Sequence, residues 1–210
     1  MAKGYTVTDL CENKKLYPDK LYTNVLQDFY KSLFVKKVYV YKLSNNDIIQ
    51  IVFTEGQFCH LIGFDYFGYE GNKGWDKLLK NPKKISSFSK QTKFKLLQYR
   101  IMSFNKIFSI LNNPNVYIYE AKEYPEFSYK SIYFAVLKEE NRIYKLGIGK
   151  DKTNINYCET YLVDLNKEQH NYYLKEENLL KIKSKKILDI VEFNEIRQQK
   201  LEVALTKETE

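Results

Sequence analysis

His60 stands in an apolar run, QFCHLIGF at residues 57–64, and is one of two histidines in a chain of 210 residues. An imidazole titrates near neutral pH, so His60 is a candidate general acid or base. The alternative is a core histidine bonded to a main-chain carbonyl. Apolar neighbours fit both interpretations, because they hold the ring in place and shift its pKa by desolvation. The other histidine, His170, lies in a polar stretch and is expected at the surface.

Positive charge is concentrated in one segment of the chain. The sequence has 34 basic and 26 acidic residues, a formal net charge of +8. Residues 77–119 hold nine of the basic residues and no acidic one, which leaves 25 basic and 26 acidic residues elsewhere. A concentrated basic surface predicts a polyanionic partner such as nucleic acid. A solvated, lysine-rich face is the alternative that charge alone leaves open.

Arg100 lies within this segment, on a predicted helix whose apolar stripe runs from Phe94 to Leu111. Its planar guanidinium group matches two phosphate oxygens, which makes it a candidate phosphate clamp. The alternative is a surface arginine in a salt bridge, although the segment supplies no acidic partner. Lys93 and Lys95 begin the same helix and are candidate substrate contacts.

Hydrophobic periodicity predicts the elements that position these groups. An amphipathic helix is expected from about Asp19 to Phe34. The segments KKVYVYKL and DIIQIVF, separated by SNN, predict a hairpin. The histidine motif follows this hairpin between Gly56 and Gly63, so the backbone is expected to leave the ladder there. The glycine-rich stretch after it is expected to hold a short helix from Trp75 to Leu79.

The second half of the chain is predicted to be mostly strand. The candidates are VYIYEA, SIYFAVLK, RIYKLGIG and YCETYLVDL, with NYYLKE, NLLKIK and KKILDIVEF as shorter ones and NEIRQQKLEVALTKETE as a terminal helix. This order predicts an α+β domain whose helices pack on one side of an antiparallel sheet. Residues 19–165 form the predicted domain, residues 1–18 an N-terminal extension, and residues 166–210 strands and a helix that complete the domain or are appended to it.

Several kinds of site are not indicated by the sequence. It contains no HExxH, GxSxG or CxxC motif, and GIGKDKT lacks the full spacing of a phosphate-binding loop. No paired carboxylates stand at a metal-binding spacing, so neither a metal nor another cofactor is expected. The N-terminus lacks the apolar core of a secretory signal, and no run is long enough to cross a membrane. Cys11, Cys59 and Cys158 fit reduced thiols, so we expect a cytoplasmic protein that binds no membrane.

Four motifs in a common order resemble one nuclease family. FCHLIGF resembles the F-x-H-L-x-G signature of a phage-associated branch, the fourth, of the barnase, EndoU, colicin and RelE-like nucleases. YRIMSFNKIFSIL is similar to that branch's helix, YKLGIG to its strand ending in Leu-Gly-aliphatic, and NYCETYLVD to its late strand. The resemblance extends over roughly Asp19 to Asp164. It implies a fold of that nuclease type and metal-independent RNA cleavage in phage or anti-phage conflict.

On the late strand the resemblance implies that Thr160 donates to a phosphate oxygen, although Cys158 and Glu159 stand where a proline is expected before it. Barnase-like chemistry implies instead that Glu159 is the base. A regular strand places Tyr157 and Glu159 on one face and Cys158 and Thr160 on the other, so both groups cannot enter one cleft. Tyr157 is a further candidate substrate contact. Lys150 is a candidate phosphate contact, with a solvated loop lysine as its alternative.

These observations favour a metal-independent ribonuclease with RNA as its partner. The cleft is expected between the basic helix and the sheet, with His60 and Arg100 at its centre. The RNA 2′-hydroxyl is the expected nucleophile, which requires a base, an acid and donors that stabilise the phosphorane. Two alternatives stay open. One is a non-catalytic binding or inhibitor protein of a phage or mobile element on the same fold, and the other is a toxin covered by a cognate antitoxin protein.

Overall fold

The computed structural model describes residues 4–120, 124, 129–152, 155–167, 171 and 173–207, with the backbone alone at 199–207. The predicted surface position of His170 lies outside the described residues. None of the described helices combines the length and the apolar character needed to cross a bilayer. The three cysteines are free thiols, as predicted.

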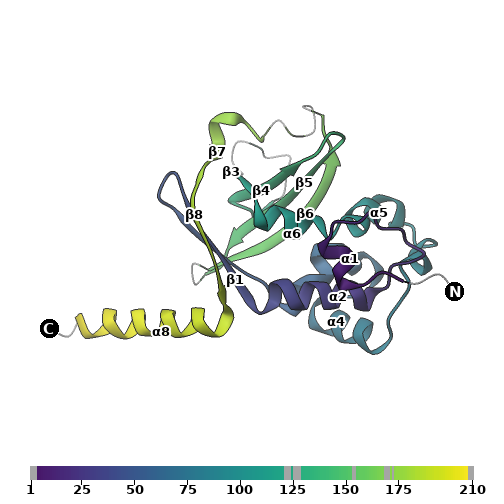
Figure 1. Ribbon diagram of the computed structural model, residues 1–210, viewed down its shortest axis with the longest axis horizontal. Coiled ribbons are helices and arrows are strands. Elements are labelled where there is room, and N and C mark those ends of the chain that lie inside the picture. Colours follow the sequence, from purple (N-terminus) through teal and green to yellow (C-terminus); the bar gives the residue numbers. More distant parts are fainter. Residues whose placement is uncertain are drawn as a thin grey trace.

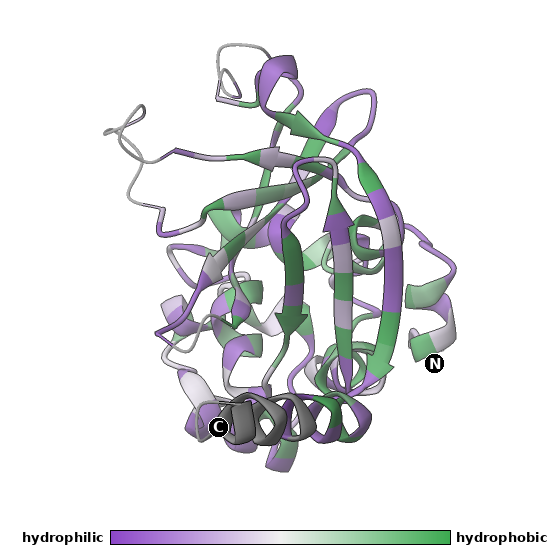
Figure 2. Cartoon of the chain, turned by 90° about the vertical axis from the view of Figure 1, so that its left-hand side faces the viewer, coloured by the Kyte–Doolittle hydropathy of each residue, from purple (hydrophilic) through white to green (hydrophobic). Residues whose placement is uncertain are grey.

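The described strands form one eight-stranded sheet in the order β7-β3-β4-β5-β6-β2-β1-β8 (Figure 1). Its strands are β1 (Lys37–Leu43), β2 (Ile48–Val52), β3 (Asn115–Ile118), β4 (Tyr133–Lys138), β5 (Arg142–Lys150), β6 (Asn156–Leu165), β7 (Leu179–Leu180) and β8 (Ile182–Asp189). Neighbouring strands are antiparallel except β2 and β6, which pair in parallel. The predicted hairpin is confirmed as β1 and β2. In Figure 2 hydrophobic and hydrophilic segments alternate along the strands, as expected where one face lies on a core.

Most of the described helices lie together on one side of the sheet (Figure 1). They are α1 (Val7–Cys11), α2 (Thr23–Tyr30), α3 (Phe58–Ile62), α4 (Gly71–Lys80), α5 (Phe94–Met102), α6 (Lys106–Asn112) and α8 (Ile190–Lys207), with a π-helical turn at Lys31–Val35 and 3-10 turns at Glu55–Gln57, Phe64–Phe67, Ile85–Phe88 and Glu176–Asn178. Helix α8 instead extends from the end of β8 away from this group. The predicted α+β fold is confirmed.

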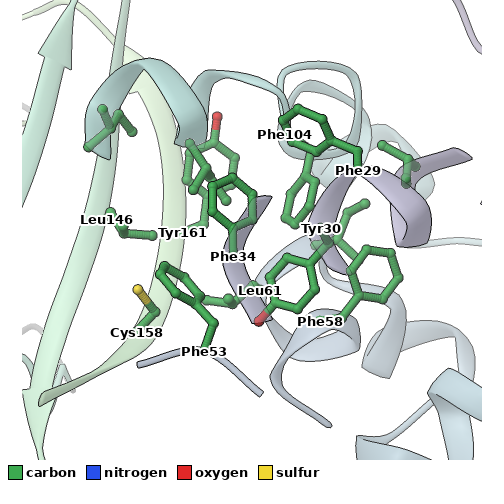
Figure 3. Close-up of a cluster of buried hydrophobic side chains, with 14 of the residues drawn as sticks. Phe29, Tyr30, Phe34, Phe53, Phe58, Leu61, Phe104, Leu146, Cys158 and Tyr161 are labelled. Carbon is green, nitrogen blue, oxygen red and sulfur yellow. The ribbon is translucent and has the colours of Figure 1, made fainter. Parts of the chain in front are cut away.

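A core rich in aromatic rings joins the helices to the sheet (Figure 3). Tyr30 of α2 lies within it, with its ring centroid 5.4 Å from that of Phe58 on α3 and 6.1 Å from that of Phe104. The Tyr30 hydroxyl donates to the carbonyl of Thr54, so the buried polar atom is satisfied. Tyr161 of β6 meets the ring of Phe104 from the sheet side. The histidine motif is therefore fixed to the sheet through the apolar neighbours of His60.

The single long helix predicted from Phe94 to Leu111 is wrong, because the chain breaks between α5 and α6. At the break the hydroxyl of Tyr161 donates to the carbonyl of Ser103 at 2.7 Å. Asn105, which is buried, donates to the main-chain carbonyls of Leu10 and Lys14. Tyr161, Leu10 and Lys14 are all distant in sequence from the break, so the apolar periodicity alone did not predict it.

The C-terminal predictions are partly wrong. KKILDIVEF is strand only as far as Asp189, where α8 begins, and the Asp189 carboxylate accepts from the amide of Val191 at 2.9 Å. An aspartate before the first helical turn is a common helix start, and this signal was overlooked. No strand covers the described residues of NYYLKE, whereas the terminal helix and a short strand in NLLKIK are present.

Candidate active site

The site begins where β2 stops pairing with β6. The parallel pair extends only over Ile51–Asn156 and Val52–Tyr157, and the chain then turns through Glu55–Gln57 into α3. Helices α3 and α5 both contact β6. Beyond Tyr157, therefore, the edge of β6 that faces away from β5 is bordered by helices, and no described strand pairs with it there. Main-chain carbonyls at such an edge remain accessible to side chains.

Helix α3 buries every side chain except that of His60. Phe58, Cys59, Leu61 and Ile62 are fully buried, whereas 58% of the His60 side chain is exposed. This exposure excludes the interpretation of His60 as a core histidine. The apolar neighbours anchor the helix in the core, and the His60 imidazole reaches solvent from this anchored helix.

Asp65 holds the His60 ring from the turn that follows. Its Oδ2 lies 2.9 Å from His60 Nδ1, and its Oδ1 accepts from the amide of Tyr66 at 3.0 Å. The hydrogen bond raises the pKa of His60, and the main-chain carbonyl of Glu159 adds to this, while burial and the charge of Arg100 oppose it. The imidazolium form is therefore retained to higher pH than in a free histidine. Nδ1 faces the carboxylate, so Nε2 is the ring nitrogen that Asp65 does not occupy.

Gly63 creates the turn that brings Asp65 back to His60. Its φ of +87° ends α3 in the left-handed conformation, and its amide donates to the carbonyls of Cys59 and His60. A Cβ at this position would lie 2.8 Å from Leu97 Cδ2, so the glycine also permits the close approach of α5. Sequence reasoning noted this glycine but missed Asp65, which stands two residues later.

Arg100 binds the C-terminal end of α3. Its Nε donates to the carbonyl of Leu61 at 2.7 Å and its Nη2 to the carbonyl of His60 at 2.5 Å. Among the described residues no acidic side chain forms an ion pair with it, and burial lowers its pKa although the nearby Asp65 charge opposes this. A cation at a helix C-terminus is favourable, because the last carbonyls carry partial negative charge. The structure thus brings the predicted His60 and Arg100 into direct contact.

Glu159 is the extra residue of a β-bulge. In the β5–β6 register Gly147 pairs with Thr160, but Ile148 pairs with Cys158, so Glu159 has no opposite residue. Its carboxylate accepts from the amide of Lys130 at 2.9 Å and from the hydroxyl of Ser131. The Glu159 carboxylate therefore contacts the segment before β4, whereas its main-chain carbonyl is the group that acts on the pKa of His60.

The bulge overturns the predicted alternation of faces. Cys158 lies in the aromatic core on the helix side, whereas the methyl of Thr160 packs over Gly147, beside Phe134 on the opposite face. Tyr157 packs over Gly149, two residues along β5, so Tyr157 and Thr160 share a face. The prediction that Cys158 and Thr160 share one was wrong, because the extra residue shifts the alternation by one position.

The predicted lysines lie around the site rather than in it. Lys93 Nζ lies 6.0 Å from the ring centroid of Tyr66, the residue after Asp65. Lys95 is exposed on α5, and Lys150 is exposed at the end of β5. Of these, Lys93 is tied to the site by its contact with Tyr66 and adds positive potential there.

Tyr129 is a site residue that the sequence did not single out. Burial raises its pKa to about 12, with the nearby carboxylates of Asp164 and Glu159 adding to the shift and Arg100 opposing it. Its hydroxyl therefore lies within electrostatic reach of both Glu159 and Arg100. No local signal in SYKS, one of several tyrosine-containing segments, predicts this position.

The arrangement provides the groups that acid–base cleavage of a phosphodiester requires: an oriented imidazole, a carboxylate and a guanidinium around one strand edge. Among the described residues no three side chains of His, Cys, Asp or Glu cluster so that they could hold a metal ion. The fold and site are those of a nuclease-like α+β domain.

A family model described as phage-Barnase-EndoU-ColicinE5/D-RelE like nuclease 4 matches residues 26–201. The chain belongs to this nuclease family, as the resemblance in its motifs predicted. Searches of curated proteins and of solved structures find no match to the chain.

Proposed function

We propose that this chain is a metal-independent endoribonuclease in which His60 transfers a proton at the scissile phosphodiester. The observation that carries the proposal is the hydrogen bond between His60 Nδ1 and Asp65, made by the one exposed side chain of α3. A structural histidine gains nothing from such exposure. An acid–base catalyst requires it, together with a partner that fixes its tautomer.

In the proposed reaction the RNA 2′-oxygen attacks the adjacent phosphorus and its proton passes to a base. The 5′-oxygen leaves with a proton from an acid, which gives a 2′,3′-cyclic phosphate and a free 5′-hydroxyl. His60 suits the acid, because Asp65 raises its pKa and so favours its protonated form. Glu159 suits the base: a carboxylate has about four acceptor positions, and the contacts to Lys130 and Ser131 leave room for the 2′-hydroxyl.

Arg100 has two roles in this proposal. Its Nε and Nη2 position α3 through the carbonyls of Leu61 and His60, so this edge of the guanidinium is not open to phosphate. Its positive charge, with any donor not bound to α3, stabilises the extra negative charge of the phosphorane. Tyr129, whose pKa is affected by the charges of Arg100 and Glu159, is a further candidate contact to the phosphate.

The remaining predicted residues have secondary roles. Lys93, Lys95 and Lys150 attract the RNA backbone from their exposed positions. Tyr157 stays a proposed substrate contact. The role of Thr160 as a phosphate donor stays a prediction, and its nearly buried position over Gly147 favours packing instead.

We also propose that the enzyme acts in the cytoplasm in phage or anti-phage conflict, with RNA as its substrate. The support is the family description, which places these nucleases with phages, and the basic segment at residues 77–119. A cognate antitoxin or target protein is the partner that such a conflict protein would need.

The test is cleavage of single-stranded RNA in the presence of EDTA, with DNA of the same sequence as a negative control. His60→Ala is expected to lower the rate about 100-fold or more, while thermal unfolding changes little because the side chain is exposed. Leu96→Ala, at a position on α5 that is 74% exposed, is the matched control and keeps full activity. Wild-type protein that cuts no RNA but binds a protein or nucleic acid tightly would favour the non-catalytic interpretation.

A further inference from the structure

A cavity of about 520 Å³ is lined by residues of α5 that neighbour Arg100. Its lining includes Tyr99 of α5, Arg142 of β5 and the N-terminal segment from Asn13 to Pro18. The size falls in the range of small-molecule pockets, which are about 300–1,000 Å³. The segment from Asn13 to Pro18 precedes residue 26, where the family match begins.

We propose that this cavity binds a nucleobase of the RNA substrate, as a subsite beside the scissile phosphate. The inference rests on the proposed ribonuclease function and adds a specificity-determining site to it. Its central element is a stacked pair: the guanidinium carbon of Arg142 lies 3.7 Å from the ring centroid of Tyr99, whose residue surface is 56% exposed. Single-stranded RNA bases stack on aromatic rings and on guanidinium planes of this kind.

The charge of the cavity favours a polyanion. Four basic residues line it, Lys14, Lys15, Lys106 and Arg142, against one acidic residue, Glu139. Glu139 is paired with Lys106 at 2.5 Å, and Lys14 is paired with Asp9 and Glu12. Among the described residues no carboxylate forms an ion pair with Lys15 or Arg142, so these two charges are available to a phosphate or a base.

The N-terminal wall is held in place by hydrogen bonds to α6. Asn13 Nδ2 donates to the hydroxyl of Ser109 at 2.6 Å, and the buried Asn105 donates to the carbonyl of Lys14 at 3.5 Å. Tyr5 donates to the carbonyl of Lys15 at 2.9 Å. A wall fixed by such contacts is formed before the ligand arrives, which lowers the entropic cost of binding.

The cavity and the candidate active site share two elements, α5 and β6. Tyr99 precedes Arg100 on α5, and the two side chains leave the helix in different directions, one to the cavity and one to α3. Val163, which also lines the cavity, lies four residues beyond Glu159 on β6, about 13 Å at the usual rise of a strand. An RNA bound at His60 that also enters the cavity would pass along α5 from Arg100 to Tyr99.

The experiment measures binding of a fluorescently labelled RNA hexanucleotide to protein that carries His60→Ala, so that the RNA is not cut. Adding Tyr99→Ala is expected to weaken binding about 5- to 100-fold, the effect of losing one base stack. Adding Arg142→Gln is expected to weaken it in the same direction. Leu96→Ala on α5 and Arg197→Gln on α8 are the matched controls, since the latter removes the same charge elsewhere, and both keep the affinity within about twofold.

A cleavage assay with His60 intact compares the hexanucleotide with a dinucleoside monophosphate that cannot reach the cavity. Tyr99→Ala is expected to raise KM for the hexanucleotide and to lower the ratio of hexanucleotide to dinucleoside cleavage. If Tyr99→Ala and Arg142→Gln bind the hexanucleotide as tightly as the controls, the subsite is overturned while the ribonuclease proposal stands. If wild-type protein neither binds nor cuts RNA, both proposals fall. An equal loss on both substrates indicates a structural effect on α5 and also overturns the subsite.

Discussion

At the scale of single residues, the contact between His60 and Asp65 determines how the site responds to pH. The apolar sequence around His60 predicts a buried helix, and this is correct for its neighbours. It does not predict which side chain of that helix reaches solvent. Asp65 was missed because its approach depends on the left-handed turn at Gly63, and a glycine indicates a turn without giving its direction in space.

Replacing Asp65 with Asn is expected to lower the pKa of His60, because the variant removes the charge that stabilises the imidazolium. In the proposed reaction His60 acts in its protonated form, so activity falls as the pH rises through its pKa. The alkaline limb of the kcat/KM profile should therefore move to lower pH in Asp65→Asn, and the rate at neutral pH should fall about tenfold. NMR titration of the His60 ring reports the same shift without an activity assay.

Asp28→Asn serves as the control, since Asp28 is exposed on α2 and also loses one negative charge. Its pH profile should match that of the wild type. An alkaline limb at the same pH in Asp65→Asn and wild type would show that His60 is not the titrating acid.

At the scale of elements, α3 is fixed in two ways: the apolar face binds it to the core, and Arg100 and Gly63 hold its C-terminus. Arg100 was predicted as a phosphate clamp from its position on α5, and the structure shows that it binds main-chain carbonyls of α3 first. Carbonyl partners of this kind cannot be read from side-chain patterns, because every residue carries a carbonyl. The bulge at Glu159 is equally hidden, since it depends on the register with β5.

Gly63→Ala is expected to destabilise the protein by about 2–3 kcal/mol, as the sum of the cost of a positive φ for alanine and of the contact with Leu97. Gly68→Ala separates these contributions. Gly68 has a φ of +78°, but no atom lies within 4 Å of the place that a Cβ would occupy, so only the backbone cost of about 1 kcal/mol applies. Urea unfolding compares the two variants. If both variants lost the same free energy of unfolding, Leu97 of α5 would not be in close contact with the turn at Gly63. The placement of Arg100 on α5 would then need revision.

At the scale of the whole molecule, the order of elements and the family were predictable from the sequence. The breaks between helices and the pairing between distant strands were not. β-Branched and aromatic runs predicted β1 to β6, because strand formation follows local periodicity. The break between α5 and α6 depends on Tyr161, 58 residues from Ser103, and no local pattern records such a contact. The parallel pairing of β2 with β6, which opens the strand edge for His60, is likewise a property of the assembled sheet.

The position of the N-terminal segment also becomes clear only in the whole molecule. It was predicted as an extension at residues 1–18, and in the structure residues 13–18 line the cavity next to Tyr99. The segment from Tyr5 to Lys15 hydrogen-bonds to α6 and to itself. In the proposed subsite, a segment that precedes the family match therefore contributes to RNA binding.

The most direct test of the central claim, that His60 protonates the leaving 5′-oxygen, uses an RNA in which that bridging oxygen is replaced by sulfur. A thiolate leaves without protonation, because its pKa is far below that of an alcohol. We predict that His60→Ala loses about 100-fold or more on the oxygen substrate and only a few-fold on the sulfur substrate. An equal loss on both substrates would contradict the assignment of His60 as the acid.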